Sequence, residues 1–447
     1  MSPLVLAACG GGGGSLEPPQ IARQPADATV QTGADASLSV DVTGGASTFQ
    51  WLRNGVEVAG ATQASLKLPA SLLDSGAVFS VRASNAAGSV TSRTATLTVT
   101  SPALTILAGA PTSPDPMPAP GTSTAGYVDG TGSAARFQGL GPIAVDDAGN
   151  IYVGEGNIIR KVSPLGVVTT FAGSNDERRT LDGTAATARF LQIQELVFDR
   201  TRQLLVSLEY AIGIGVGMAV REITLAGTVT TVAGIAGTFD HPTRAPDGTL
   251  YGLSGNSVDG GLGPTTPTAV YRLSTTGAAV LVAGQPGVGG FMDGPGAQAL
   301  FRGPTALLAD GKGNVYVADN ACLRRIGADG TVVTLAGAPA TPPAGAPGGT
   351  LTLADGTGAG ARFGYISDLR MDSSGNILVV DHGEAAGSNK PEDLNLIRRV
   401  TPEGRVTTIA RSGGTQYRGA WRLALGGTGI AYVLGMFWVG RFEPFAG

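Results

Sequence analysis

Cysteine, lysine and long apolar runs are scarce in this chain of 447 residues. Its two cysteines, Cys9 and Cys322, are not expected to pair because Cys9 lies in a glycine-rich tail, so no disulfide indicates the redox compartment. No apolar stretch approaches the ~18 residues of a membrane-spanning helix. The net charge is −4, and nucleic-acid binding is disfavoured because it needs a concentrated positive surface. The lysines of the whole chain are Lys67, Lys161, Lys312 and Lys390.

Glycine, in contrast, is abundant. The chain has 70 Gly and 27 Pro, whereas aromatic residues make up only 6%. Gly and Pro separate strands by tight turns, and helical periodicity is hard to find, so the sequence predicts an all-β chain. With 42% hydrophobic residues it can bury sizeable cores, and its length suits two or three domains. It contains no P-loop, no GxSxG nucleophile elbow and no CxxC motif.

Residues 1–20 are interpreted as an anchor and a tether. Leu6-Ala7-Ala8-Cys9 resembles a bacterial lipobox, which implies that a signal peptide is removed and that Cys9 carries a lipid. The glycine run 10–14 would then be a flexible tether. Only eight residues precede Cys9, none of them Lys or Arg, and a start assigned too late would explain this departure from a signal peptide. The alternative is an apolar tail with an incidental Cys.

Residues 21–100 predict a small β-sandwich. Apolar and polar residues alternate in short runs such as 37–42 and 95–99, with Gly, Asn and Asp between them. Asn54-Gly55 is a hairpin signal, and Trp51 lies shortly before it. Period-two runs joined by such turns indicate antiparallel strands.

This segment resembles the immunoglobulin-like family. Trp51 stands where that family has its core Trp, 74–76 resembles the corner before a late strand, and 84–88 resembles the following hairpin. Val40 and Val81 occupy the positions of the family's bridging cysteines. The resemblance implies a spacer or adhesion module without chemistry of its own.

Residues 103–447 repeat one pattern. An apolar residue is followed four positions later by Gly and ten positions later by Ala, as at Val162, Gly166 and Ala172. An upstream strand pair, clearest at 150–153, brings each repeat to four strands, which predicts a propeller blade. The other copies of the apolar residue are Ile223, Leu273, Ile326 and Val400, and further strand copies are 250–253, 314–317, 376–379 and 431–434.

The two ends of this region are predicted to share one blade. A sixth copy begins at Val439, but the chain ends at Gly447 before an outer strand. Residues 104–109 match the outer strand at 333–337 in type. If they supply the missing strand, six blades close into a ring without open sheet edges.

The repeats resemble the NHL family. The segment 129–137, DGTGSAARF, and the run Ile159-Arg160-Lys161-Val162 carry this resemblance, whereas the third repeat keeps only 239–242 of it. Further copies are 182–190, 293–301, 355–363 and 397–400. The resemblance implies a six-bladed β-propeller. RNA binding, known for some animal members, is disfavoured by the charge, and some lyases of this shape hold a metal with several His.

Loop lengths differ between the two ends of the predicted blades. On one end the spacing from Asp146 to Asn150 recurs with little change at 199–203, 310–314 and 372–376. On the other end the connections vary widely, and binding loops tolerate insertion better than a structural rim does. The predicted ligand face is the end that carries loops 209–219, 255–269 and 382–396, together with 110–125 and 338–354.

Three acidic residues are candidates for a ligand site. Glu155, Asp319 and Asp381 end equivalent strands, which are expected to face the channel mouth, where the carboxylates would bind a metal or a sugar. The alternative is that they are solvated turn residues. The Asp of each DG repeat is a candidate ligand for a cation at the ring mouth, but it is expected instead to form a local turn and to pair with the Arg of its own segment, as Asp129 with Arg136.

His241 and His382 are the only histidines, and both fall on the variable end. They are candidate metal ligands, although two His are few for zinc, which favours four ligands, and His241 also occupies an ordinary position before Pro242. Cys322 is expected to be a buried, inert thiol because no His is near it in sequence.

Together these features predict a non-enzymatic binding or scaffold protein. It would be lipid-anchored in the bacterial cell envelope or secreted, and it would recognise a protein or glycan on the variable-loop face. Membrane contact is expected only through the lipid, no nucleic acid is expected, and no cofactor is expected apart from a candidate divalent cation. The alternative is a metal-dependent lyase or lactonase at the channel mouth.

Overall fold

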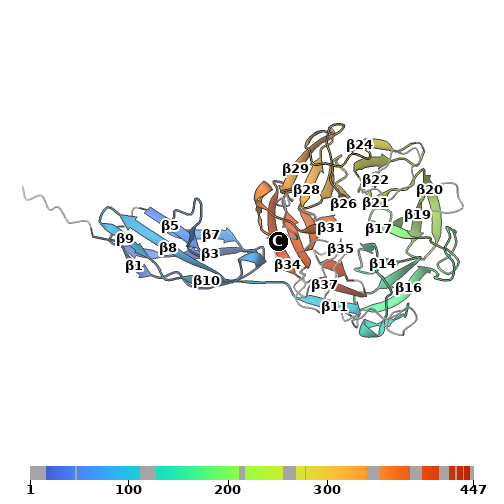
Figure 1. Cartoon of the computed structure of the whole chain (residues 1–447). Helices are drawn as coiled ribbons and strands as arrows, with labels where there is room; N and C mark the ends of the chain where they lie inside the picture. The colour runs from blue at the N-terminus through green and yellow to red at the C-terminus, as the bar shows by residue number, and fades with distance from the viewer. Residues whose placement is uncertain are drawn as a thin grey trace, which may run out of the picture. The chain divides into compact units, whose positions relative to one another are not determined.

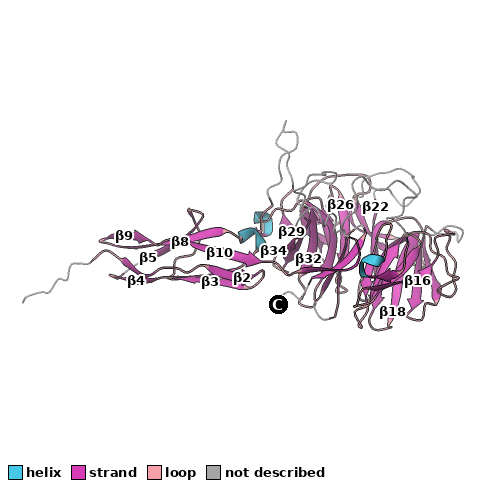
Figure 2. Ribbon diagram, turned by 90° about the horizontal axis from the view of Figure 1, so that it is seen from below, coloured by secondary structure: helices cyan, strands magenta, loops and turns pink. Residues whose placement is uncertain are grey.

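The computed structural model describes residues 17–45, 48–110, 127–210, 217–254, 268–276, 278–339, 353–382, 395–411, 422–427, 430–435 and 437–442. Within them the regular structure is nearly all strand, as predicted (Figure 2). The helical segments there are short 3-10 turns: η1 (Leu72–Asp74), η2 (Gly132–Ala134) and η3 (Gly358–Gly360). The chain divides into two units, Met1–Thr100 and Ser101–Gly447.

The first unit is built from three sheets around one apolar core. Its strands are β1 (Gln20–Arg23) paired with β4 (Asp41–Thr43); β3 (Asp35–Ser39) paired with β7 (Ser65–Pro69); and, across the largest sheet, β2 (Ala28–Gln31), β10 (Ala95–Thr100), β8 (Ala77–Asn85), β5 (Thr48–Arg53) and β6 (Val56–Glu57), with β9 (Gly88–Thr91) beside β8.

The core of the first unit forms around Trp51 of β5. Trp51 is fully buried, and its indole Nε1 donates a hydrogen bond of 3.0 Å to the carbonyl of Gln63. Val40 and Val81 are buried in the same apolar cluster. Asn54 and Gly55 adopt the left-handed conformation between β5 and β6, which confirms the hairpin predicted there.

The second unit consists of six sheets that follow one another along the chain (Figure 1). We number them sheet 1 to sheet 6. The first three are sheet 1, with β13 (Ile143–Val145), β14 (Ile151–Glu155), β15 (Ile158–Val162), β16 (Val167–Gly173) and the short β12 (Gly130–Thr131); sheet 2, with β17 (Ile193–Asp199), β18 (Leu204–Tyr210), β19 (Met218–Thr224) and β20 (Val229–Ile235); and sheet 3, with β21 (Asp240–Arg244), β22 (Leu250–Ser254), β23 (Ala269–Leu273) and β24 (Val280–Gly284).

The remaining three sheets have the same antiparallel order. They are sheet 4, with β26 (Pro304–Ala309), β27 (Val315–Asp319), β28 (Cys322–Ile326), β29 (Thr331–Gly337) and the short β25 (Gly294–Pro295); sheet 5, with β31 (Tyr365–Met371), β32 (Ile377–His382), β33 (Asn395–Val400), β34 (Arg405–Arg411) and the short β30 (Gly356–Thr357); and sheet 6, with β35 (Arg422–Leu425), β36 (Ala431–Leu434), β37 (Trp438–Phe442) and β11 (Leu104–Gly109).

Sheet 6 joins the two ends of the unit. β11 pairs antiparallel with β37, with Thr105 opposite Arg441 and Gly109 opposite Trp438. This confirms the prediction that residues 104–109 supply the outer strand of the last repeat. The innermost strands β13, β17, β21, β26, β31 and β35 lie next to one another in that order, and β35 also lies next to β13, so the arrangement is a propeller-like ring around a central channel.

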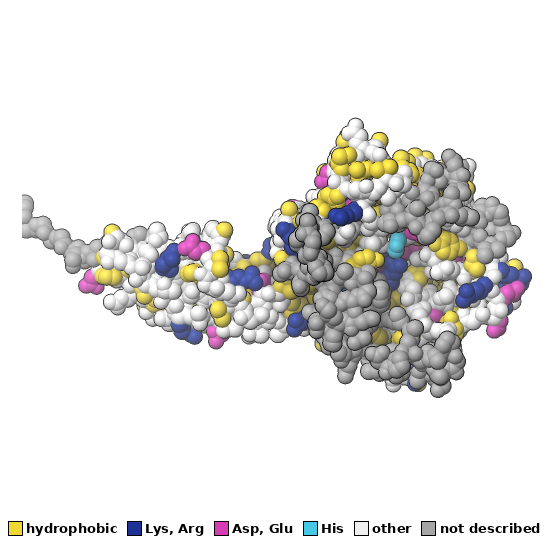
Figure 3. Space-filling view, viewed as in Figure 1, with side chains coloured by type: hydrophobic (Ala, Val, Ile, Leu, Met, Phe, Trp, Pro, Cys, Tyr) yellow, Lys and Arg dark blue, Asp and Glu magenta, His cyan; other side chains and the backbone are white. Residues whose placement is uncertain are grey.

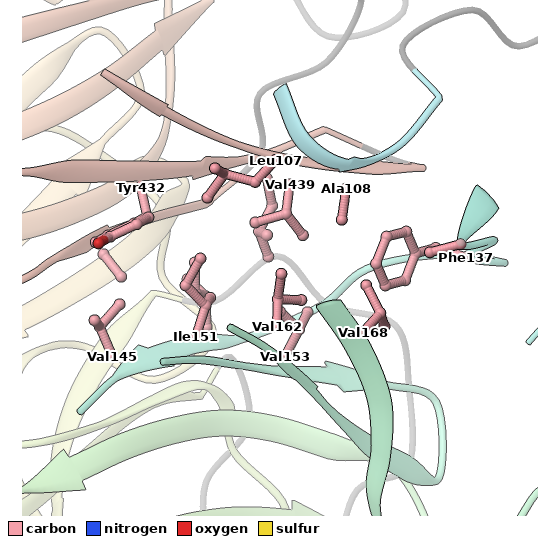
Figure 4. Close-up of a cluster of buried hydrophobic side chains, with 14 residues drawn as sticks. Leu107, Ala108, Phe137, Val145, Ile151, Val153, Val162, Val168, Tyr432 and Val439 are labelled. Carbon is pink, nitrogen blue, oxygen red and sulfur yellow. The ribbon is translucent and has the colours of Figure 1, made fainter. Parts of the chain in front are cut away.

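The apolar cores lie between consecutive sheets. The cluster in Figure 4, for example, combines Leu107 and Val439 of sheet 6 with Ile151 and Val168 of sheet 1. Phe137, from the segment before β13, packs there beside Gly109, where a Cβ atom would lie 2.9 Å from the Phe137 ring. Because each sheet packs against a neighbour on both sides, both of its faces are apolar. Sheets 6 and 1 pack against each other in the same way, so the ring is closed there as well.

The two ends of the ring differ in how they connect the strands. At one end the turns are short, and an Asp holds the turn between the first two strands: Asp146 accepts hydrogen bonds from the backbone N–H groups of Ala148 and Asn150. Asp310 and Asp372 repeat this arrangement. We call this end the tight-turn rim, and the opposite end, where the second strand leads to the third, the long-connection rim.

Candidate functional site

Four arginines occupy equivalent positions on the third strands of sheets 1, 2, 4 and 5. They are Arg160, Arg221, Arg324 and Arg398, which we call the bridging arginines, and all four are fully buried. Each donates from Nη1 to a buried carboxylate at the end of the neighbouring second strand; for Arg160 and Glu155 the distance is 2.8 Å. The other acceptors are Glu209, Asp319 and Asp381.

Each bridging arginine also reaches the DG segment that precedes its sheet. Arg160 donates from Nη2 to Asp129 at 2.9 Å and to the carbonyl of Val128 at 3.0 Å, and it lies over the ring of Phe137 at 5.3 Å. Asp129 in turn accepts a hydrogen bond from the backbone N–H of Thr170 on β16. One side chain therefore ties the second strand, the fourth strand and the DG segment together.

The arginine, the strand-end carboxylate and the DG segment are either all present or all absent in a given sheet. In sheet 3 the strand register places Tyr271 at the position of the arginine and Ser254 at that of the carboxylate. In sheet 6 the corresponding residues are Gly440 and Gly435. The DG motif is missing from the sequence before both sheets. Joint loss is expected for an internal structural group, because the buried arginine or the buried strand-end carboxylate left alone would be an unpaired buried charge.

Glu155, Asp319 and Asp381 are therefore not where the sequence suggested. They belong to second strands, not to the innermost strands that line the channel, and each is at most 1% exposed. They lie in three different sheets, and each is bound to the arginine of its own sheet. Burial raises the pKa of all three, that of Asp381 to about 6, although the paired arginines act in the opposite direction.

The expected pairing of Asp129 with Arg136 is wrong. Asp129 pairs with Arg160, whereas Arg136 donates to backbone carbonyls of its own segment, among them that of Ala135 at 2.8 Å. The DG segments before sheets 4 and 5 show the same pairing with the third strand: Asp293 pairs with Arg324, and Asp355 pairs with Arg398. The signal that sequence reasoning missed is the Arg of the Ile159-Arg160-Lys161-Val162 run, which alternation places on the face of the strand toward the DG segment.

His382 is held inside sheet 5. Its Nε2 lies 2.8 Å from the hydroxyl of Ser367, its Nδ1 is hydrogen-bonded to Asn395, and its ring lies beside Tyr365 with centroids 5.8 Å apart. Burial lowers the pKa of His382, which favours the neutral imidazole.

His241 lies elsewhere, on the innermost strand β21, where its backbone is in the left-handed region. Its pKa is lowered by burial and by Arg422, while Asp240 and Asp368 act to raise it. The structure therefore places the two histidines in different sheets. Among the described residues, no group of three or more His, Cys, Asp or Glu side chains is arranged to hold a metal ion.

Cys322 is buried, as predicted, and burial raises the pKa of its thiol to about 12, which disfavours the reactive thiolate. Cys9 lies outside the described residues, and so do most of the loops 110–125, 209–219, 255–269, 338–354 and 382–396. The described part of the chain contains no helix long and apolar enough to cross a membrane.

A further set of charged side chains lies on the innermost strands. Glu195 of β17, Asp368 and Arg370 of β31 and Arg422 of β35 form a group of four charges, which we call the channel network. Arg370 Nη1 lies 2.8 Å from Asp368, and Arg422 lies 3.8 Å from the same carboxylate. On the face shown in Figure 3, histidine, basic and acidic side chains lie together near the centre of the ring.

No family model and no curated protein matches this chain. Similar solved structures include an auxiliary nutrient binding protein from Bacteroides ovatus, at 13% identity and a TM-score of 0.36, covering 88% of this chain and 98% of that one. A periplasmic gluconolactonase from Pseudomonas aeruginosa has 14% identity and a TM-score of 0.38, covering 74% and 89%. A protein of unknown function from Bacteroides thetaiotaomicron has 17% identity and a TM-score of 0.36, covering 89% and 99%. These likenesses concern the fold alone.

Proposed function

We propose that this chain is a non-enzymatic binding or scaffold protein that recognises a protein or a glycan on the long-connection rim of its ring. The observation that carries this proposal is the difference between the rims. The strands β18, β22 and β32 all end at the same rim, and the connections 211–217, 255–268 and 383–394 start there. In proteins with a rigid scaffold, ligand-binding residues are found mostly on the loops that vary in length.

The same strand connection can be short in this fold, which supports a role for the longer ones beyond chain closure. In sheets 1 and 4 the second and third strands are joined by Gly156-Asn157 and by Asn320-Ala321 alone. Ring closure therefore does not require the extra residues of sheets 2, 3 and 5. We attribute those residues to ligand contact.

The finer assignments of the two units belong to the same proposal. Residues 103–447 are proposed to be a six-bladed propeller of NHL type, supported by the bridging arginines that recur with the DG segments. Residues 21–100 are proposed to be an immunoglobulin-like spacer, supported by the buried Trp51 and the packing of Val40 and Val81 in one cluster.

We further propose that residues 1–20 anchor the protein to the bacterial cell envelope, with Cys9 as the lipid-bearing residue. The support is the Leu6-Ala7-Ala8-Cys9 run followed directly by glycines. Mass spectrometry of the full chain expressed in a bacterium that processes lipoproteins tests this: a diacylglycerol adduct on Cys9 is expected, and an unmodified thiol would contradict it.

A glycan array and a panel of envelope proteins, probed with the full chain, test the recognition proposal. Three variants replace 211–216, 255–267 or 383–394 with an Asn-Gly turn, which the short connections of sheets 1 and 4 indicate the fold accepts. At least one variant is expected to lose every specific contact while its melting temperature stays unchanged. Ligands retained by all three variants would contradict the proposal.

The alternative is a metal-dependent lyase or lactonase at the channel mouth, for which His241 on the innermost strand β21 is the candidate ligand. Metal analysis of the purified full chain separates the two functions. A stoichiometric metal that is lost in a His241→Ala variant would favour the enzyme over the binding protein.

A further inference from the structure

A second candidate site lies in the channel, at the rim opposite to the long connections. The tight-turn half of the channel contains a cavity of about 400 Å³, a volume typical of small-ligand pockets, which span roughly 300–1,000 Å³. All six innermost strands contribute to its wall, for example Val145 of β13, Leu308 of β26 and Leu425 of β35. Asp310 and Asp372 of the tight turns lie at its outer end.

Two charged side chains of the channel network, Glu195 and Arg370, line this cavity. Arg370 Nη2 and Glu195 Oε1 are 3.7 Å apart, which is too far for a hydrogen bond. Nη2 is buried and has no hydrogen-bond partner among the described residues. A buried donor without a partner is costly, so a third group is expected to bridge this pair.

The pair is held in place by its neighbours. Arg370 Nη1 donates to Asp368 at 2.8 Å and to the carbonyl of Leu369 at 2.9 Å. Asp368 also accepts a 2.7 Å hydrogen bond from the backbone N–H of Leu423 on β35. The guanidinium is therefore fixed with one edge satisfied by protein and the Nη2 edge left for a ligand.

The charges and the wall define the chemistry of that ligand. Three acidic and three basic side chains line the cavity, so its lining is formally neutral and does not favour a charged ligand; they are Glu195, Asp310, Asp372, Arg200, Arg244 and Arg370. A hydroxyl group can accept from Nη2 and donate to Glu195 at the same time. Most of the other lining residues are apolar, among them Leu308 and Leu425, and they suit the C–H face of a sugar ring.

We propose that this cavity binds one uncharged polyhydroxylated small molecule of monosaccharide size, with a hydroxyl bridging Arg370 Nη2 and Glu195. The site is distinct from the surface on the long-connection rim, and it does not depend on the recognition function assigned to that surface.

Calorimetry and saturation-transfer NMR on the full chain test this proposal, with glucose, galactose and mannose as neutral sugars and glucuronate and glucosamine as charged counterparts. At least one neutral sugar is expected to bind, and to bind at least tenfold more tightly than the charged counterparts. Glu195→Gln is expected to weaken it at least tenfold, because the amide removes the bridging acceptor charge. Glu222→Gln, on the outward part of sheet 2, is the matched control and should leave binding unchanged.

A second variant keeps the test valid if Glu195→Gln unfolds. Leu425→Trp fills the cavity from its outer part without removing a polar contact, and it is expected to abolish sugar binding at an unchanged melting temperature. The proposal is overturned if no neutral sugar binds, which would leave water as the bridging group, or if bound sugar is insensitive to both variants. Because the loop-shortened variants do not touch the cavity, their failure to bind other ligands is distinguishable from either result.

Discussion

At the residue scale, the bridging arginines and the carboxylates at the ends of the second strands account for most of the buried charged side chains among the described residues of the second unit. Each arginine meets two carboxylates, two backbone carbonyls and an aromatic face, so its donors at Nη1 and Nη2 are saturated; for Arg324 these partners are Asp319, Asp293, Leu300, Met292 and Phe301. A guanidinium can serve this many planar partners at once, whereas the ammonium of Lys cannot. These arginines are therefore structural, and they hold the DG segments on the outside of the ring.

Arg324→Met is expected to lower the free energy of unfolding by about 3–5 kcal/mol, because it leaves Asp319 as an uncompensated buried charge. Arg202→Met is the control: Arg202 also forms an ion pair, with Glu222, but it is exposed, and its loss is expected to cost about 0–1 kcal/mol. Chemical denaturation of both variants measures the difference. Equal effects of the two substitutions would show that the buried pair has no special role.

The carboxylates of these pairs also predict a pH dependence. Burial raises the pKa of Glu209 to about 7 from an ordinary 4.5. Between about pH 4.5 and 7 the folded protein holds a proton that the unfolded chain has released, so the contribution of Glu209 to stability falls as the pH rises through this interval. The stability of the native protein relative to Glu209→Gln is therefore expected to decline from pH 4.5 to 7.

Denaturation curves at several pH values measure this decline. Glu222→Gln, next to the bridging arginine on β19, corrects for the loss of a carboxylate outside the core. A difference between the native protein and Glu209→Gln that stays constant, or that grows with pH, contradicts the assignment.

Sequence reasoning reached some of these residues and not others. Asp146, Asp310 and Asp372 were recognisable because an Asp four residues before an Asn accepts local backbone hydrogen bonds, and such contacts follow from spacing alone. Glu155 was misplaced because a carboxylate at a strand end has the same sequence pattern whether it is solvated or paired with an arginine from the next strand. Glu209 was missed because β18 extends past it to Tyr210 and hides the equivalence.

At the element scale, the Gly of each repeat has two roles. Gly404 lies in the turn between β33 and β34 with a φ of +81°, a conformation that favours glycine. It also lies against the preceding sheet, because a Cβ atom there would be 2.3 Å from the carbonyl oxygen of Leu335. The repeat spacing indicated the turn, but the contact between neighbouring sheets was not readable from one repeat.

Gly404→Ala is expected to destabilise the protein by about 3 kcal/mol or more, because the strained turn and the close approach to β29 add up. Gly375→Ala is the matched control. Gly375 has a φ of +83°, but a Cβ atom added there would meet no described atom within 4 Å, so this substitution is expected to cost only about 1–2 kcal/mol. Thermal unfolding compares the two, and similar losses would contradict the close approach between sheets 4 and 5.

At the scale of the whole molecule, closure and the two unlike rims determine what the second unit can bind. Closure between sheets 6 and 1 could be predicted because Val439 opens a repeat that lacks its outer strand. The cavity could not be predicted, because each innermost strand supplies only a few residues to it and none of them carries a motif. The same limit applies to the channel network, whose members come from strands far apart in the sequence.

The pairing of β11 with β37 is the most direct test of the closed ring. In a background of Cys9→Ser and Cys322→Ala, Thr105→Cys with Arg441→Cys places two thiols on directly opposed residues. Thr105→Cys with Arg325→Cys is the control, because Arg325 occupies the equivalent position on sheet 4. Peptide mapping under mild oxidation is expected to show the 105–441 disulfide in nearly all molecules and the 105–325 disulfide in almost none. Absence of the 105–441 bond, or equal yields of the two, would contradict a ring closed by the strand at 104–109.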